Sequence, residues 1–158
     1  DMGAAMSPFN AFMFIQGLET LHLRMREHSA NGQKVAEHLS KHPMVERVAY
    51  PGVSSGLPKE RADKYLSNGC GGLLGFEIKG GHEAGKKFIN SLEMLYHVAN
   101  IGDSRSLAIH PASTTHSQLN EEELASGGIS PSYIRLSIGL EHIDDILADI
   151  DQALTKAE

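Results

Sequence analysis

The clearest hydrophobic pattern of the chain lies near its C-terminal end. Apolar residues alternate with polar or small ones over residues 133–139, which is the two-residue period of a strand with one buried face. Over residues 143–154 apolar residues recur instead every three or four positions, which predicts an amphipathic helix. Arg135 falls on the polar face of the predicted strand, opposite Ile134 and Leu136. A half-buried strand followed by such a helix predicts a small sheet that helices cover on one face.

The rest of the chain alternates predicted helices with predicted strands. A helical segment begins at Ser7-Pro8, where serine can cap free amide groups and proline is accepted at the first helical position. It runs to about His42 as two helices or one kinked pair. Asn120 and Glu123 have the spacing of a capping box, which predicts one more short helix. Further strands are predicted over residues 45–50, 74–79 and 95–99, and further helices over residues 58–66 and 82–92.

The first predicted helix carries more apolar surface than one small sheet can cover. Large apolar side chains surround most of this helix, namely Phe9, Phe12, Met13 and Phe14. Such a helix predicts burial against a partner domain or subunit. We therefore expect two parts: a helical preface over residues 1–42, which packs on a missing large domain or a partner subunit, and a small α/β domain over residues 43–158.

Composition narrows the class of protein. A chain of 158 residues is long enough for one domain with a core of its own. Its 14 Lys and Arg against 20 Asp and Glu give a net charge of −6, which argues against a nucleic-acid-binding surface or a polybasic membrane anchor. No apolar run approaches the roughly 20 residues of a membrane span, and the single cysteine, Cys70, fits a reducing compartment. We expect a cytoplasmic protein with neither a nucleic-acid nor a membrane partner.

Two features could bind a ligand, although each also has an ordinary structural explanation. The guanidinium of Arg135 is always charged and needs water, a carboxylate or a ligand around it. On the pattern alone, a solvated position on the strand is the simpler explanation. In residues 99–106, backbone amides and the Asn100 side chain could hold a carboxylate, but the same residue types are also typical of turns. Residues 100–118 show little periodicity, and we expect a loop there.

Histidines and hydroxyl side chains gather in residues 110–116 without forming a complete site. A zinc site is not predicted, because no cysteine or carboxylate stands at a suitable interval. A serine nucleophile is not predicted either, because no acid that would orient a histidine is visible. His38 and His42, four residues apart, also lack a third ligand. We therefore predict no metal site and a structural loop over residues 110–116.

Several short motifs follow one another in order along nearly the whole chain. They are Ser7–Phe12, Gly17–Leu21 with Arg24-Met25, Val45–Val48 with Tyr50–Gly52, and Ile134–Glu141. Together they resemble signatures of the Cys/Met-metabolism family of pyridoxal-phosphate enzymes. Within that family, residues 100–103, 106–107 and 110–119 most resemble the O-acetylhomoserine sulfhydrylases. The resemblance covers only the C-terminal part of such enzymes.

The resemblance implies a fold and a substrate site. The implied fold is the α+β C-terminal domain of fold type I pyridoxal-phosphate enzymes, with a small, mostly antiparallel sheet covered by helices on one face. Arg135 is implied to pair with the α-carboxylate of an amino-acid substrate, which suits its planar donor fork. Asn100 falls where relatives carry a carboxylate-binding Ser or Asn, with the backbone of Ile101 alongside. Thr115 lies near the substrate in some relatives.

The resemblance also implies what these residues do not supply. In the family, the lysine that holds the cofactor, the aromatic residue that stacks on it and the phosphate-binding loop all precede this part of the enzyme. None of the eight lysines here stands in a matching context. We therefore expect a fragment with no catalytic or cofactor-binding residue, which binds no cofactor and is inactive alone. Pyridoxal phosphate and the missing N-terminal domain belong to the intact enzyme, which is expected to be a homotetramer.

The implied reaction is a γ-replacement. Acetate leaves from O-acetylhomoserine and sulfide or a thiol takes its place, which gives homocysteine or methionine. One alternative is another enzyme of the family, methionine γ-lyase or a cystathionine synthase or lyase. A second alternative is a stand-alone ligand-binding regulatory domain. The apolar first helix argues against that second alternative, because such a domain would leave its phenylalanines exposed.

Overall fold

The computed structural model describes residues 3–158, apart from the side chains of Glu121 and Ala125. Within these residues the centre of the fold is a five-stranded sheet in the order β1-β2-β5-β4-β3. Neighbouring strands are antiparallel, except that β3 and β4 run parallel. The strands are β1 (Val45–Ala49), β2 (Leu73–Ile78), β3 (Tyr96–His97), β4 (Leu107–Ile109) and β5 (Tyr133–Ser137). The predicted α+β fold with a small, mostly antiparallel sheet is confirmed.

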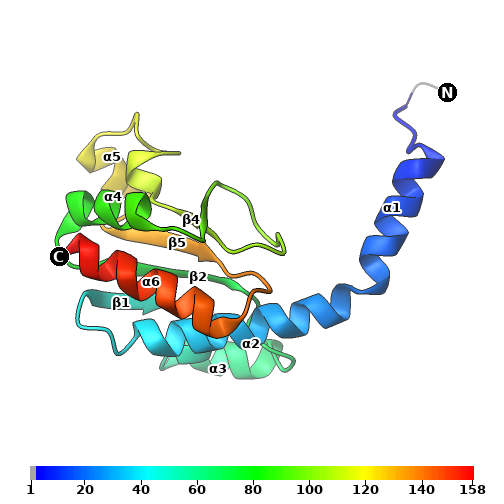
Figure 1. Ribbon diagram of the computed structural model, residues 1–158, viewed down its shortest axis with the longest axis horizontal. Coiled ribbons are helices and arrows are strands. Elements are labelled where there is room, and N and C mark those ends of the chain that lie inside the picture. Colours follow the sequence, from blue (N-terminus) through cyan, green and yellow to red (C-terminus); the bar gives the residue numbers. More distant parts are fainter. Residues whose placement is uncertain (1–2) are drawn as a thin grey trace.

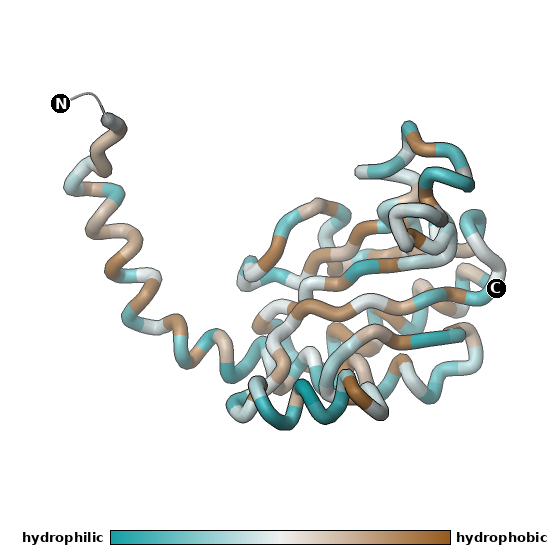
Figure 2. The backbone as a smooth tube through the Cα atoms, turned by 180° about the vertical axis from the view of Figure 1, so that it is seen from behind, coloured by the Kyte–Doolittle hydropathy of each residue, from teal (hydrophilic) through white to brown (hydrophobic). Residues whose placement is uncertain are grey.

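Helices cover one face of this sheet (Figure 1). On the covered face α6 packs against both α2 and α4. From behind, the strands lie nearest to the viewer, which leaves the other face of the sheet open (Figure 2). The helices are α1 (Pro8–Glu19), α2 (Leu21–Leu39), α3 (Leu57–Tyr65), α4 (Gly81–Ser91), α5 (Glu121–Ser126) and α6 (Ile143–Ala157).

The core lies between the sheet and these helices. On the two central strands, Phe76 of β2 faces Ile134 of β5, and both are almost completely buried. Phe88 of α4 meets the ring of Phe76 edge to face, with 5.4 Å between the ring centroids. Because residues on one face of a strand are two positions apart, burial of Ile134 and Leu136 turns the intervening Arg135 toward the open face.

One strand was not predicted from the sequence, and another is shorter than predicted. Residues 107–109 were expected to lie in a loop, but they form β4 between β5 and β3. All three residues of β4 are buried, so the alternation that reveals a half-buried strand is absent from this segment. The strand predicted over residues 95–99 pairs only at Tyr96 and His97.

α1 extends away from the rest of the molecule as an arm (Figure 1). It buries none of its residues, whereas α2 contributes Val35 and Leu39 to the core. Arg24 ties the two helices together at their junction, because its guanidinium donates to the carbonyl of Gly17 at 2.9 Å and to the Thr20 hydroxyl at 2.7 Å. The helical preface over residues 1–42 thus joins the core through α2, and its packing on another domain or subunit stays a prediction. Among the helices of the described residues, none combines the length and apolar character that crossing a bilayer requires.

Candidate functional site

Arg135 lies at the middle of the open sheet face. It is the register partner of Gly75 on β2 and of Ile109 on β4, so the two central neighbours of β5 flank it. One Nη of its guanidinium donates to the backbone carbonyl of Asn100 at 3.2 Å. No ion pair within residues 3–158 includes Arg135. Its remaining N–H groups are therefore available to a carboxylate that approaches this face.

The loop between β3 and β4 brings Asn100 to this position. Two residues after Asn100, the N–H of Gly102 donates to the hydroxyl of Ser137 on β5, at 3.3 Å. The side-chain oxygen of Asn100 accepts the N–H of Ile101 at 2.9 Å, so these two groups satisfy each other. The structure thus joins Asn100 to Arg135 through the Asn100 carbonyl. The amide N–H groups of the Asn100 side chain are the donors that this loop can add for a carboxylate.

A cavity of about 370 Å³ opens beside Arg135, and Thr115 lies on its wall. The Thr115 hydroxyl contacts Nδ1 of His116 at 2.8 Å, and His116 lines the same cavity. Ile101 instead lines a separate hollow of about 190 Å³ together with His28. Of the four residues named from the sequence, Arg135 contacts Asn100 and shares a cavity with Thr115. The backbone N–H of Ile101, the group expected to join the site, is bonded to the Asn100 side chain.

Tyr133 is a further residue of this cavity that the sequence did not single out. Its ring lies directly across Gly75, where any larger residue would collide with it. Burial raises the pKa of Tyr133 and outweighs the opposite effect of Arg135 and Arg47. Its hydroxyl therefore stays protonated near neutral pH and can donate a hydrogen bond. The signal available in the sequence was its position, two residues before Arg135 on the same strand face.

The histidine-rich loop over residues 110–116 serves as a wall of the cavity. His110 is fully buried, and its Nε2 donates to the carbonyl of Pro131 at 2.7 Å. The Ser113 hydroxyl lies 2.8 Å from Nδ1 of the same ring. Burial lowers the pKa of His110, so the ring is held neutral and both of its nitrogens are used for packing the loop. This arrangement supports the structural interpretation of the segment.

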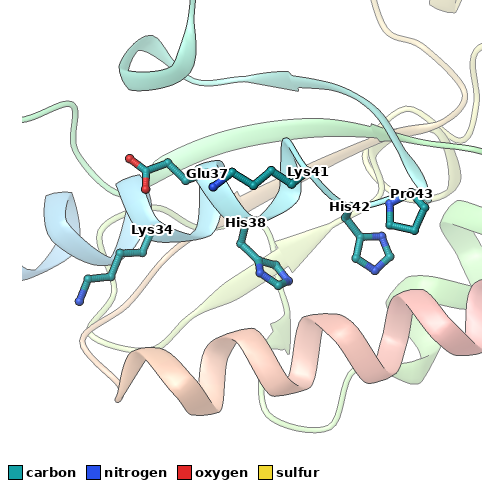
Figure 3. A pocket seen from close by; sticks show the side chains of 6 residues that line it. All are labelled: Lys34, Glu37, His38, Lys41, His42 and Pro43. Carbon is teal, nitrogen blue, oxygen red and sulfur yellow. The ribbon is translucent and has the colours of Figure 1, made fainter.

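A second cluster of titratable side chains lies at the C-terminal end of α2 (Figure 3). There a cavity of about 350 Å³ is lined by residues that include His38 and His42, whose rings both point toward α6. His38 Nε2 lies 2.6 Å from a carboxylate oxygen of Asp151, which ties α2 to α6. Across residues 3–158 as described, no three His, Cys, Asp or Glu side chains are grouped so that they could hold a metal ion. The cluster therefore has the character of a contact between helices.

Comparison with known proteins places this geometry in a family. A family model described as Cys/Met metabolism PLP-dependent enzyme matches residues 1–155. The chain belongs to this family. It is 57% identical over 155 residues to the O-acetyl-L-homoserine sulfhydrylase of Leptospira meyeri, a match that covers 98% of this chain and 35% of that relative. It is 47% identical to the homocysteine synthase of Schizosaccharomyces pombe, over 99% of this chain and 37% of the relative.

Two further relatives extend the comparison. The L-methionine gamma-lyase of Pseudomonas putida is 47% identical, over 96% of this chain and 38% of that enzyme. A crystal structure of a putative O-acetylhomoserine (thiol)-lyase from Campylobacter jejuni superposes with a TM-score of 0.88 at 47% identity, covering 98% of this chain and 37% of that one. That structure contains N′-pyridoxyl-lysine-5′-monophosphate. The chain thus spans little more than a third of the length of these relatives, and it corresponds to their C-terminal part.

Pyridoxal phosphate is the cofactor of the family, and the described residues fit only part of such an active site. The guanidinium of Arg135 and the donors around it suit the carboxylate of an amino acid. No lysine lines the cavity beside Arg135 among the residues that the structure describes. The residues at this cavity therefore suit a carboxylate, while none of them is a lysine that could link to the cofactor.

Proposed function

We propose that this chain is the substrate-binding, C-terminal part of a pyridoxal-phosphate-dependent O-acetylhomoserine sulfhydrylase. The observation that carries the proposal is the position of Arg135, whose guanidinium stands on the open sheet face, bonded to the Asn100 loop and without an acidic partner among the described residues. Two O-acetyl-L-homoserine sulfhydrylases are 57% and 48% identical to this chain and a homocysteine synthase is 47% identical, which supports the choice within the family.

Arg135 would bind the α-carboxylate of the substrate with its planar fork of N–H groups. The Asn100 carbonyl accepts one N–H and so helps to orient the guanidinium. In this proposal the Asn100 side-chain amide and the Thr115 hydroxyl, which lines the same cavity as Arg135, would add donors. Held at its carboxylate, the substrate keeps one orientation of its Cα–H bond, which is a positioning contribution to the rate. Pyridoxal phosphate, when bound, supplies the electron sink for the chemistry at the neighbouring carbons.

The overall reaction exchanges one bond at the γ-carbon of the amino acid. The C–O bond to acetate breaks, and a C–S bond to sulfide forms, with acetate leaving and homocysteine as the product. A thiol such as methanethiol in place of sulfide would give methionine. The proton released by hydrogen sulfide balances the negative charge of the departing acetate.

Replacement of Arg135 in the full-length enzyme tests this function. Charge-assisted hydrogen bonds contribute about 1.5–3 kcal/mol, so Arg135→Ala is expected to raise the KM for O-acetylhomoserine roughly 10- to 150-fold. Arg47→Ala is the matched control, because Arg47 is an exposed arginine on the same sheet face that pairs with Glu77 at 2.6 Å. The function is contradicted by an Arg135→Ala enzyme whose steady-state kinetics match those of the wild type.

Methionine γ-lyase is the second candidate function, and the identity of 47% to one such enzyme favours keeping it. Two assays of the full-length enzyme separate the candidates: O-acetylhomoserine with sulfide, and methionine alone. We expect turnover in the first assay to exceed turnover in the second. The reverse order would assign the enzyme to the lyases.

We also propose that α1 packs on a large cofactor-binding domain or on a partner subunit of a cytoplasmic homotetramer. The exposed phenylalanines of α1 support this, because an apolar helix surface of that extent is normally covered. Light scattering of the full-length enzyme tests the tetramer. The 158 residues alone are expected to give neither the absorbance of bound cofactor nor turnover. The appearance of either would contradict the proposal that another domain binds the cofactor.

A further inference from the structure

We propose that Glu141 is a positioning residue for the carboxylate site, because it fixes the loop that carries Asn100 at the distance where Asn100 meets Arg135. This inference rests on the proposed function of Arg135. Glu141 lies in the turn between β5 and α6, six residues after Arg135, and does not touch the cavity beside that residue. It acts on the site only through the loop over residues 99–106.

The carboxylate of Glu141 binds one residue of that loop twice. Its Oε1 accepts the backbone N–H of Ser106 at 2.6 Å, and its Oε2 accepts the Ser106 hydroxyl at 2.8 Å. Ser106 is fully buried, and its hydroxyl oxygen in turn accepts the N–H of Gly139 at 2.9 Å. Hydrogen bonds to a charged acceptor are about twice as strong as neutral ones. Glu141 therefore fixes the end of the loop directly before β4.

The turn that carries Glu141 is itself held from two sides. The buried side chain of Asn31, on α2, donates to the carbonyls of Gly139 and Glu141 at 3.2 and 3.1 Å. On the loop side, the N–H of Leu140 donates to the carbonyl of Ser104 at 2.8 Å. A side chain on Gly139 would collide with the Ser104 carbonyl, so the loop and the turn lie in direct backbone contact. These bonds hold the backbone of the turn in place, so the position of the Glu141 carboxylate is well defined.

The contacts nearer to the site are longer than those of Glu141. Gly102 reaches Ser137 at 3.3 Å, and Arg135 reaches the Asn100 carbonyl at 3.2 Å. The shortest bond of the loop is the 2.6 Å bond from the Ser106 N–H to Glu141, and the Ser106 hydroxyl bond equals the Leu140–Ser104 backbone bond at 2.8 Å. In this inference the longer bonds at Gly102 and Asn100 depend on this anchored end of the loop for their alignment. Without the Glu141 carboxylate, we expect the Asn100 carbonyl to lose its place beside the guanidinium, and the carboxylate site to lose its shape.

Ligands with and without a carboxylate separate this role from a merely structural one. The full-length holoenzyme is titrated with glycine and with methylamine, which share an amino group, while the absorbance of the bound cofactor is followed. Glu141→Gln, which preserves the shape of the side chain, is expected to weaken glycine binding about five- to tenfold. Methylamine binding is expected to change less than about twofold, because methylamine makes no bond to Arg135.

Two further variants complete the experiment. Glu46→Gln is the matched control, since Glu46 is an exposed carboxylate on β1, and it leaves both titrations unchanged. Ser106→Ala removes the hydroxyl and keeps the backbone bond to Glu141, so it is expected to act in the same direction as Glu141→Gln but more weakly. Should Glu141→Gln yield no folded holoenzyme, the same comparison of glycine with methylamine is decided by Ser106→Ala.

The outcomes distinguish this inference from the function beneath it. Equal losses of glycine and methylamine, or unchanged glycine binding in both loop variants, would overturn the positioning role. Arg135→Ala is measured in the same assay. If Arg135→Ala weakens glycine binding while the loop variants do not, only the role of Glu141 fails. If Arg135→Ala has no effect on glycine either, the proposed carboxylate site itself fails.

Discussion

α1 and α6 are both rich in apolar residues, yet they differ completely in burial. Ile146, Ile150 and Leu154 of α6 have no exposed surface at all. In α1, by contrast, Phe9 is 70% exposed and Phe14 is 62% exposed, and no residue of the helix is buried. Both helices have a capping side chain at the start, Ser7 for α1 and His142 for α6, so the helix ends do not explain the difference.

The difference lies in how the apolar residues are distributed around each helix. In α6 they recur at three- and four-residue steps and form one stripe, which a single sheet face can cover. In α1 four consecutive apolar residues, Phe12 to Ile15, surround the helix, so several covering surfaces are needed. A helix whose apolar residues point in all directions is built for an environment that the described residues do not provide. This is the physical basis for placing another domain or subunit around α1.

The largest expected effect is on the buried stripe of α6. Ile150→Ala removes a fully buried side chain and leaves a cavity, which is expected to lower the free energy of unfolding by about 2–5 kcal/mol. Phe12→Ala on α1 is the counterpart and is expected to change it by less than about 0.5 kcal/mol. Denaturant unfolding of the 158-residue chain measures both. Similar losses in the two variants would abolish the contrast between the helices.

A buried carboxylate gives α6 a second, polar anchor. Asp149 accepts the backbone N–H groups of Glu93, Met94 and Leu95 at 2.8–2.9 Å. Asp149→Ala leaves these three donors without their acceptor, and we expect a loss of about 1–3 kcal/mol. Asp145→Asn, an exposed change on the first turn of the same helix, is expected to cost only about 0.3–1 kcal/mol. Equal effects in the same unfolding assay would show that the burial of Asp149 is unimportant.

The same carboxylate sets the expected response to acid. Burial by itself raises the pKa of Asp149. Hydrogen bonds from the three backbone N–H groups and from Gln152 lower the pKa by more than burial raises it, so the net pKa lies below its ordinary value. A folded-state pKa below the unfolded value of about 3.9 contributes stability above that pH, and the contribution is lost as the pH falls through the folded pKa. Unfolding free energies measured from pH 6 to pH 2 are therefore expected to fall less steeply for Asp149→Asn than for the wild type. Parallel curves would contradict the assigned shift.

The smallest expected effect concerns the arm. Phe9→Ser combined with Phe14→Ser is expected to leave the unfolding free energy of the 158-residue chain within about 0.5 kcal/mol, because neither ring is buried there. In the full-length enzyme the same pair is expected to lower the thermal midpoint, since the rings would then lose a covering surface. A midpoint equal to that of the wild type would show that α1 stays uncovered, which would contradict its proposed packing on another domain or subunit.

Local signals in the sequence predicted local structure well. The capping box at α5 forms as its spacing predicts, because Asn120 and Glu123 exchange side-chain to backbone hydrogen bonds of 2.9 and 3.0 Å. The alternation around Arg135 likewise predicted the face to which that residue belongs. Both features depend only on neighbours within a few positions of the chain.

Features that depend on distant parts of the chain were not predictable from pattern. β4 lacks alternation because both of its faces are buried, so only its pairing with β5 defines it. Glu141 stood in a recognised motif, but its partner Ser106 is 35 positions away, and nothing in the spacing connects the two. The pattern also left open whether Arg135 is solvated or binds a ligand. Its contact with the loop is made by Asn100, which lies 35 positions earlier in the chain.

The most direct test of the carboxylate site is the structure of the full-length holoenzyme with a bound amino acid such as glycine. The account predicts that the carboxylate of the ligand lies within about 3 Å of the Arg135 guanidinium, on the open face of the sheet and next to the Asn100 loop. A carboxylate bound to another cation, with Arg135 still facing solvent, would contradict it.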